Sequence, residues 1–112
     1  MSTLEHYIAG IEKYTSPADA EAVAGIVKHL GVALKSRDAS LVASTDPEEL
    51  KRVRESWLKK KLGIAGTDAE LDTAIGEVMT KMKAQRMKER VTVYYLLAEH
   101  FKKLGALHKT AA

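Results

Sequence analysis

A cluster of basic side chains near the carboxy end of the chain is the feature that could most readily do chemistry, by binding phosphate or another anion. Five of them fall within ten residues: Lys81, Lys83, Arg86, Lys88 and Arg90. Lysine and arginine neutralise phosphates without sequence preference, and the nearby Tyr94 and Tyr95 could stack on single-stranded bases. This basic band, extended by Lys59–Lys61, would make the chain a binder of nucleic acid or another polyanion.

The competing interpretation of the basic band is a solvated helix face, which is the more common origin of such a run. Tyr94 and Tyr95 project toward the apolar side of their helix, which indicates core positions. The sequence contains no helix-turn-helix glycine, RNA-recognition motif or zinc finger. Polyanion binding through residues 81–90 is therefore kept as the alternative function, with four anion-binding candidates: Lys83, Arg86, Lys88 and Arg90.

A second pair of anion-binding candidates is Arg54 and Lys61, one heptad apart on a predicted helix. Both cations fall among apolar positions of that helix, close to Trp57, where they could bind an anion. Alternatively, the long side chains reach water over the apolar surface, or Arg54 pairs with an acid such as Asp38 or Asp72. We favour the second interpretation because it needs no ligand.

The histidines offer no metal site. The four, which are His6, His29, His100 and His108, show no i, i+4 pair and no H-E-x-x-H motif, and the chain has no cysteine. Glu99 and His100 are sequence neighbours, so on a helix they point about 100° apart and form no dyad. We expect His100 in the core or at its edge, and we expect no bound metal.

Nothing in the sequence indicates catalysis. G-x-S-x-G, Walker and G-x-G-x-x-G motifs are absent. The carboxylates are scattered or stand at expected helix starts, where capping explains them. We therefore expect no enzyme activity, no catalytic residue and no cofactor.

Leu96 is a candidate for a partner surface, because it stands on the otherwise polar side of its predicted helix. Either the N-terminal helix or the tail covers it, or it marks a site where a partner binds. Cover within the molecule is the default expectation, since single exposed leucines are common.

Length and composition fit one globular domain: 112 residues, 46% hydrophobic and 29% charged. The net charge of +3 is unevenly spread, because residues 1–56 hold 7 basic and 9 acidic groups and residues 57–112 hold 11 and 6. That asymmetry is a weak pointer to an anionic partner. The absence of cysteine fits a reducing cytoplasm. We expect no secretion signal and no membrane contact, since no run reaches the roughly 18 apolar residues of a membrane span.

Apolar periodicity predicts the first two helices. Leu4–Tyr14 carries one apolar stripe of about three turns. Ser16 and Pro17 are suited to be the N-cap and the first residue of the second helix. That helix should reach Leu30, with Gly31 as the residue that ends it.

Residues 31–45 are harder to interpret. A structureless loop of that length is uncommon in a compact domain, so we expect local helical turns. Asp38 could cap a short helix that carries Leu41 and Val42.

The next two helices have clear start signals. Asp46, Pro47 and Glu49 resemble a capping box for a third helix that runs to about Leu62 and ends at Gly63–Ile64. A capping box of the T-x-x-E kind, formed by Thr67 and Glu70, opens the fourth helix.

The last helix is expected from about Lys88 to Leu104, after a break or bend near 84–86, although a continuous helix is the alternative. Its apolar residues cover roughly 200° of the circumference, about twice the arc of a surface helix. Several neighbours must therefore pack on it. The residues that follow, 106–112, are expected to form a frayed tail.

Five stretches of the sequence carry a resemblance to known proteins: Leu30–Leu34, Arg37–Val42, Asp46–Leu50, Trp57–Gly63 and Tyr94–Glu99. They resemble a family of short bacterial proteins catalogued only as a domain of unknown function. In that family Ser, Asn, Arg and Lys precede the Tyr-Tyr helix, whereas here Lys83–Arg90 supplies Arg and Lys but no Ser-Asn pair. The resemblance covers essentially the whole chain, with the first helix weakest. It implies a small, soluble, helical bacterial protein and no particular activity.

We therefore expect an all-α fold, a single small helical domain over residues 1–112 with about five helices packed around the central C-terminal helix. As its function we expect a non-enzymatic protein-interaction or accessory role in the bacterial cytoplasm, through a protein partner or self-association. Binding of nucleic acid or another polyanion is the alternative.

Overall fold

The computed structural model describes residues 3–35, 40–43, 45–85, 88–105 and 107. Most of this part is helical: α1 (Thr3–Ile11), α2 (Ala20–Leu30), α3 (Pro47–Arg52), α4 (Asp68–Lys81) and α5 (Arg90–His100). A 3₁₀ turn, η1 (Gly31–Lys35), follows α2, and a π-helical segment, η2 (Val53–Lys61), continues α3. Two short strands complete the fold, β1 (Leu41–Val42) and β2 (Lys88–Glu89). The predicted all-α class and single small domain are confirmed.

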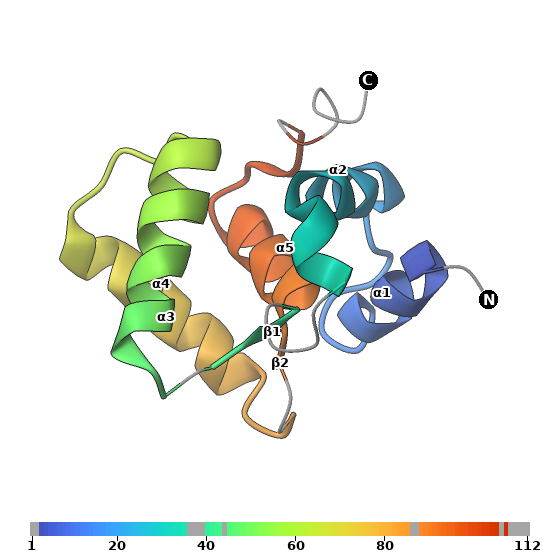
Figure 1. Cartoon of the computed structure of the whole chain (residues 1–112), viewed down its shortest axis with the longest axis horizontal. Helices are drawn as coiled ribbons and strands as arrows, with labels where there is room; N and C mark the ends of the chain where they lie inside the picture. Colours follow the sequence, from blue (N-terminus) through green and yellow to red (C-terminus); the bar gives the residue numbers. More distant parts are fainter. Residues whose placement is uncertain (1–2, 36–39, 44, 86–87, 106, 108–112) are drawn as a thin grey trace.

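Helix α5 is the centre of the molecule. It lies between α1 and α2 on one side and α3, η2 and α4 on the other (Figure 1). Every residue from Arg90 to Ala98 is buried. A helix that exposes no face to water over two and a half turns has to be covered from all sides. The prediction of a central C-terminal helix is therefore confirmed. Among the described residues, none of the helices is long and apolar enough to cross a membrane.

The two short strands replace a predicted helix. Leu41 lies opposite Glu89 and Val42 opposite Lys88 in an antiparallel pair. The short helix expected to carry Leu41 and Val42 is therefore wrong, because these residues satisfy their backbone groups by pairing with a distant segment. Asp38, which was expected to cap that helix, lies outside the described residues.

The predicted break before α5 is present as far as the structure describes it. Helix α4 ends at Lys81, and the N–H of Gln85 donates to the carbonyl of Met82 at 2.8 Å in the turn that follows. Arg86 lies outside the described residues. Because β2 intervenes, the fifth helix begins at Arg90 rather than at Lys88.

The carboxy end of α5 also differs from the predicted Leu104. The helix ends at His100, Lys102 adopts a left-handed φ of 59°, and the N–H of Lys103 returns to the carbonyl of Ala98 at 2.7 Å. This closing bond satisfies a carbonyl that the last turn leaves without a helical partner. A lysine in place of the usual glycine hides that stop from the sequence pattern.

The start of α2 differs from the prediction as well. Asp19, not Ser16, is the N-cap, because its carboxylate accepts the N–H of Ala22 at 3.2 Å. Pro17 precedes the helix instead of forming its first residue. The N–H of Asp19 donates to the Tyr95 hydroxyl at 2.7 Å, which fixes the helix start against α5. That second bond is long-range, so local signals could not reveal it.

Other local signals are confirmed. Thr67 and Glu70 form the reciprocal capping box of α4. Asp46 caps α3 by accepting a backbone N–H. Gly31 and Gly63 follow α2 and η2 with positive φ values of 44° and 65°, as expected of residues that end helices.

Residue 107 is packed against the fold, although it belongs to the segment expected to fray. Leu107 is buried, and a Cβ atom placed on Gly25 of α2 would lie 2.5 Å from the Leu107 carbonyl oxygen. Glycine at position 25 therefore lets the chain cross α2 closely. The rest of the predicted tail, 106 and 108–112, lies outside the described residues.

We predict opposite effects for the same substitution at two helical glycines. Gly25→Ala should destabilise the protein, because the added methyl group meets the backbone of Leu107. Gly76→Ala should stabilise it by about 0.5–1 kcal/mol, because open space surrounds position 76 within α4. Chemical denaturation of both variants tests this. Equal effects at the two sites would contradict the close crossing at Gly25.

Candidate functional site

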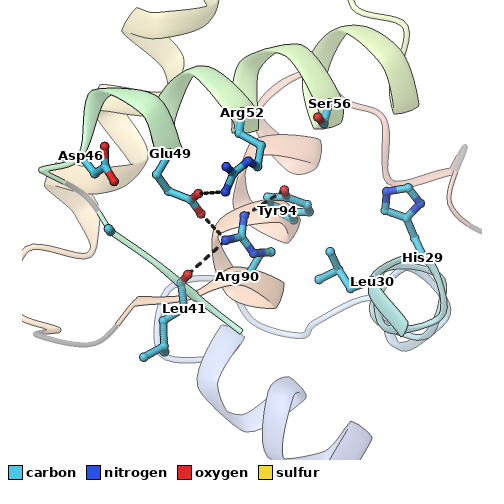
Figure 2. Close-up of a pocket in the computed structure, with 10 residues that line it drawn as sticks. His29, Leu30, Leu41, Asp46, Glu49, Arg52, Ser56, Arg90 and Tyr94 are labelled. Carbon is cyan, nitrogen blue, oxygen red and sulfur yellow. Dashed lines mark hydrogen bonds and ion pairs between the residues drawn. The ribbon is translucent and has the colours of Figure 1, made fainter. Parts of the chain in front are cut away.

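A hollow of about 510 Å³ lies between α2, β1, the rod formed by α3 and η2, and α5 (Figure 2). Ten residues line it: His29, Leu30, Leu41, Ala43, Asp46, Glu49, Arg52, Ser56, Arg90 and Tyr94. They come from four parts of the chain, namely the end of α2, the strand β1 with Ala43 after it, the rod with its cap Asp46, and α5. A concave site with apolar walls and a few polar groups is the usual form of a binding site.

A buried ion pair forms the floor of the hollow. The guanidinium of Arg90 pairs with the carboxylate of Glu49, and each side chain is only 8% exposed. The same guanidinium donates to the carbonyl of Leu41 and to the hydroxyl of Tyr94, each at 3.2 Å. Burial by itself would lower the pKa of Arg90, but the contacts with Tyr94 and Glu49 outweigh burial and raise the pKa. The floor is therefore a charged and fully hydrogen-bonded structure.

Arg52 brings a second cation to the hollow. Its Nη1 donates to Glu49 Oε2 at 2.8 Å, while its side chain is 65% exposed. Glu49 is thus held by Arg90 from below and by Arg52 from the rim, as Figure 2 shows. Because Arg52 lies in water, it contributes little to stability but remains accessible to a ligand.

An aromatic stack supports one wall. The rings of Trp57 and Tyr94 lie 4.4 Å apart at 18°, and Trp57 Nε1 donates to the Tyr94 carbonyl at 3.1 Å. The ring of His29 also packs against Trp57, with the two centroids 5.4 Å apart. Burial lowers the pKa of His29, and the nearby Lys61 lowers it further. Burial raises the pKa of Tyr94, against the opposing effect of its hydrogen bond from Arg90. At neutral pH the hollow therefore presents a neutral imidazole and a protonated phenol.

Only part of the basic band lies on the surface that the structure describes. Arg90 is buried in the floor of the hollow. Lys88 is also buried, and its Nζ donates to the Gln85 carbonyl at 2.8 Å. Lys81 and Lys83 are exposed, and Arg86 lies outside the described residues. Of the described candidates, only Lys83 is therefore exposed, and Lys88 and Arg90 do not join it in one anion-binding surface.

Tyr94 and Tyr95 are buried, so neither ring is available to stack on a base. Their interpretation as core residues is confirmed. Of the lysines that could have extended the band, Lys59 is held in ion pairs with Glu55 and Asp68. These placements weaken the polyanion alternative.

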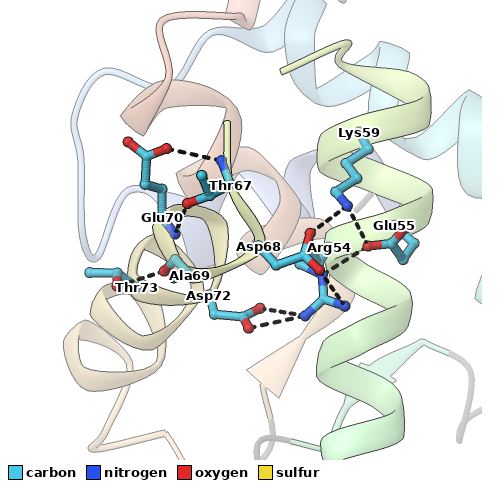
Figure 3. A network of polar contacts seen from close by, with 9 residues as sticks. All are labelled: Arg54, Glu55, Lys59, Thr67, Asp68, Ala69, Glu70, Asp72 and Thr73. Carbon is cyan, nitrogen blue, oxygen red and sulfur yellow. Dashed lines mark hydrogen bonds and ion pairs between the residues drawn. The ribbon is translucent and has the colours of Figure 1, made fainter. Parts of the chain in front are cut away.

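Arg54 belongs to an ion-pair network between η2 and α4 (Figure 3). Its Nη1 lies 3.0 Å from both carboxylate oxygens of Asp72, and its Nε donates to Glu55 at 2.8 Å. Asp68 lies 3.6 Å from its Nη2 and receives Lys59 Nζ at 2.5 Å. The interpretation that Arg54 pairs with an acid such as Asp72 is confirmed.

The π-helical winding of η2 explains why Arg54 and Lys61 do not lie within its apolar face. The N–H of Leu62 bonds to the carbonyl of Trp57, five residues back, at 2.9 Å. In this wider helix, residues four and five apart share one face, and the buried positions follow that spacing: Val53, Trp57, Leu58 and Leu62. Arg54 and Lys61 therefore fall at the edges of the apolar face, each half-buried.

Leu96 is not a partner surface in this structure. It is 3% exposed and shares a small hollow with Val78 and Lys81 of α4, so other parts of the chain cover it. His100 is exposed, with Nδ1 3.8 Å from Glu77, so its expected place in or near the core is wrong. The described residues contain no group of His, Asp and Glu side chains that could hold a metal ion.

Most residues of the hollow carry no signal in the sequence. His29, Arg52 and Ser56 carry no motif, and Glu49 was assigned to a capping box. Its true partner, Arg90, is 41 residues away along the chain. Asp46 caps α3 without help from Glu49. The sequence therefore offered one sign of the ion pair, which is that Glu49 is an acid the cap does not need.

We predict that breaking the buried pair is far more costly than breaking the rim pair. Glu49→Gln should lower the free energy of unfolding by about 3 kcal/mol, because it leaves Arg90 buried without its carboxylate. Arg52→Ala should cost less than about 1 kcal/mol, because Arg52 is exposed. Replacing both buried partners, in E49M/R90M, should recover much of the loss. Urea unfolding measures all three, and similar costs for E49Q and R52A would refute the buried pair.

The network of Figure 3 predicts a loss of stability in acid. The contacts with Arg54 and Lys59 lower the pKa of Glu55, and Lys59 lowers that of Asp68, from ordinary values of 4.5 and 3.8. Stabilisation by such carboxylates is complete above these ordinary values and is lost as the pH falls through the lowered ones. The thermal midpoint should therefore drop between about pH 5 and pH 2.

The double variant E55Q/D68N should show a smaller drop over the same range, since it no longer titrates at these positions. Glu48→Gln, an exposed site outside the network, should follow the wild-type profile. Superimposable profiles of the wild type and the double variant would mean that the network does not contribute.

Comparison with known proteins gives the chain a family. No curated protein was found to match it. Residues 6–105, which run from within α1 to the turn after α5, match a family described as "Protein of unknown function (DUF2853)". That match covers nearly the whole chain and agrees with the resemblance noted in the sequence. The chain therefore belongs to the DUF2853 family of proteins of unknown function.

Proposed function

We propose that the protein is a non-enzymatic interaction module, and that the hollow of Figure 2 receives part of a protein partner. The observation that carries this proposal is the construction of the hollow. Its apolar wall groups Leu30, Leu41 and Ala43 surround a floor that the Glu49–Arg90 pair holds in place. A preformed apolar site on a rigid floor loses little conformational entropy when a partner binds.

The carboxylates of the hollow support binding rather than acid–base chemistry. Asp46 accepts the N–H of Glu48 at 3.0 Å as the cap of α3. Glu49 is held by two arginines. Each carboxylate therefore has a structural role that it would have to abandon in order to transfer protons.

A protein partner fits the hollow better than a nucleic acid does. The formal charges of its lining cancel, because Arg52 and Arg90 stand against Asp46 and Glu49. Nucleic acid requires a surface of uncompensated cations. We also propose that the protein acts in the bacterial cytoplasm, in agreement with its lack of cysteine.

We predict that filling the hollow abolishes partner binding. Peptides selected on the purified protein from a displayed random library should bind Ala43→Trp at least tenfold more weakly than the wild type. Ala43 is exposed and lines the hollow, so an indole at this position occupies the site without disturbing the core. Fluorescence polarisation of the labelled peptides gives the affinities.

Lys83→Trp is the matched control, since it adds the same ring to an exposed position outside the hollow. It should leave peptide binding unchanged. Selected peptides that bind all three proteins equally, or a selection that yields no binder, would overturn the hollow as the interaction site.

A further inference from the structure

We propose that the hollow recognises the carboxy-terminal end of a partner chain, namely an apolar last residue with its free α-carboxylate. This inference rests on the proposed function, because it specifies the part of a partner that the hollow accepts. It depends on three features of the lining: a wall of hydrogen-bond donors, an apolar cleft beside that wall, and a balanced formal charge.

The donor wall is formed by Arg52 and Ser56. Both project from the rod of α3 and η2 toward the hollow (Figure 2), and both are exposed. A guanidinium has five N–H donors in a planar fork. In the contact that the structure describes for Arg52, Nη1 donates to Glu49, so the other N–H groups of the guanidinium can donate to a ligand. Guanidinium forks bind carboxylates through two parallel hydrogen bonds, and the Ser56 hydroxyl supplies another donor on the same wall.

The apolar cleft lies next to this wall. Leu30 and Leu41 form its sides, and burial together with the nearby Lys61 keeps His29 at its edge uncharged at neutral pH. The site therefore places an apolar pocket beside a carboxylate receptor. A chain end presents these two groups on a single Cα atom, so both enter one hollow of about 510 Å³. An internal Asp or Glu is less suitable, because the partner's backbone would have to continue in both directions from the residue that enters the hollow.

The charge balance selects a carboxylate over a phosphate. Asp46 and Glu49 line the same hollow as the two arginines. A carboxylate brings one negative charge to this neutral lining, whereas a phosphate group brings up to two. Removing two charges from water costs more than removing one, and a lining without excess positive charge does not offset the difference. The guanidinium of Arg52 can thus bind the single negative charge of a chain-terminal carboxylate, although the hollow has no excess of cations.

The test uses two pools of random hexapeptides, one with a free carboxy terminus and one amidated. Each pool is passed over the immobilised full-length protein, and mass spectrometry identifies what is retained. Wild type should enrich free-acid peptides that end in Leu, Ile, Met or Phe at least tenfold over their amidated counterparts. Arg52→Gln should abolish that preference, and Arg52→Lys should keep only part of it, because lysine retains the charge without the fork.

Two further variants keep the outcome interpretable. Lys51→Gln removes a neighbouring cation of α3 that does not line the hollow, and it should retain the full preference. Ser56→Ala removes a wall donor without touching an ion pair, and it should reduce the preference several-fold. Circular dichroism of each variant verifies the fold before the pools are applied.

The result separates this inference from the proposed function. Retention of free-acid and amidated peptides to the same extent, lost in Ala43→Trp, would overturn recognition of a chain end but leave the hollow as an interaction site. Failure to retain either pool, while displayed peptides bind in the hollow, would also overturn it. If no peptide of any kind depends on the hollow, the proposed function itself fails.

Discussion

The fold depends on the position of one buried cation, Arg90. It is the first residue of α5, and its side chain joins three segments by contacting Glu49 of α3, the Leu41 carbonyl of β1 and Tyr94 of its own helix. Its backbone N–H also donates to the carbonyl of Ser40 at 2.8 Å. A buried ion pair adds little net stability, but a single buried charge without its partner is costly. Arrangements that separate Arg90 from Glu49 are therefore strongly disfavoured, and the pair fixes how α3 and β1 meet α5.

The π-helical winding of η2 contributes to the same site from the opposite side. It turns Trp57 inward, where the indole stacks on Tyr94 and donates to the backbone of α5. The same winding moves Arg54 to the edge of the rod, where it joins η2 to α4 through Asp72. π-Helical turns are rare and are frequently found at functional sites. Here the segment both shapes a wall of the hollow and carries Ser56 into it.

The sequence revealed the features that depend on neighbouring residues and missed those that depend on distant ones. The capping box at Thr67, the cap at Asp46 and the central position of α5 all follow from local patterns. The pairing of Leu41 with Glu89 does not, because two-residue strands have no periodicity to detect. Nor does any pattern along the chain join Glu49 to Arg90. For the same reason the hollow, which four parts of the chain build, could not be predicted, although several of its residues, such as Arg90 and Glu49, were named for other roles.

The uneven charge along the chain illustrates why composition alone is a poor guide to a partner. The carboxy-terminal half is formally basic, yet its cations at 59 and 90 are held by Asp68 and Glu49 within the fold. An ion pair formed inside the molecule screens both charges from outside partners, so a linear count overstates the field at the surface. The charge that a ligand contacts in the hollow depends instead on which individual side chains are exposed. Arg52, on the acidic half of the chain, is accessible there, whereas Arg90, on the basic half, is not.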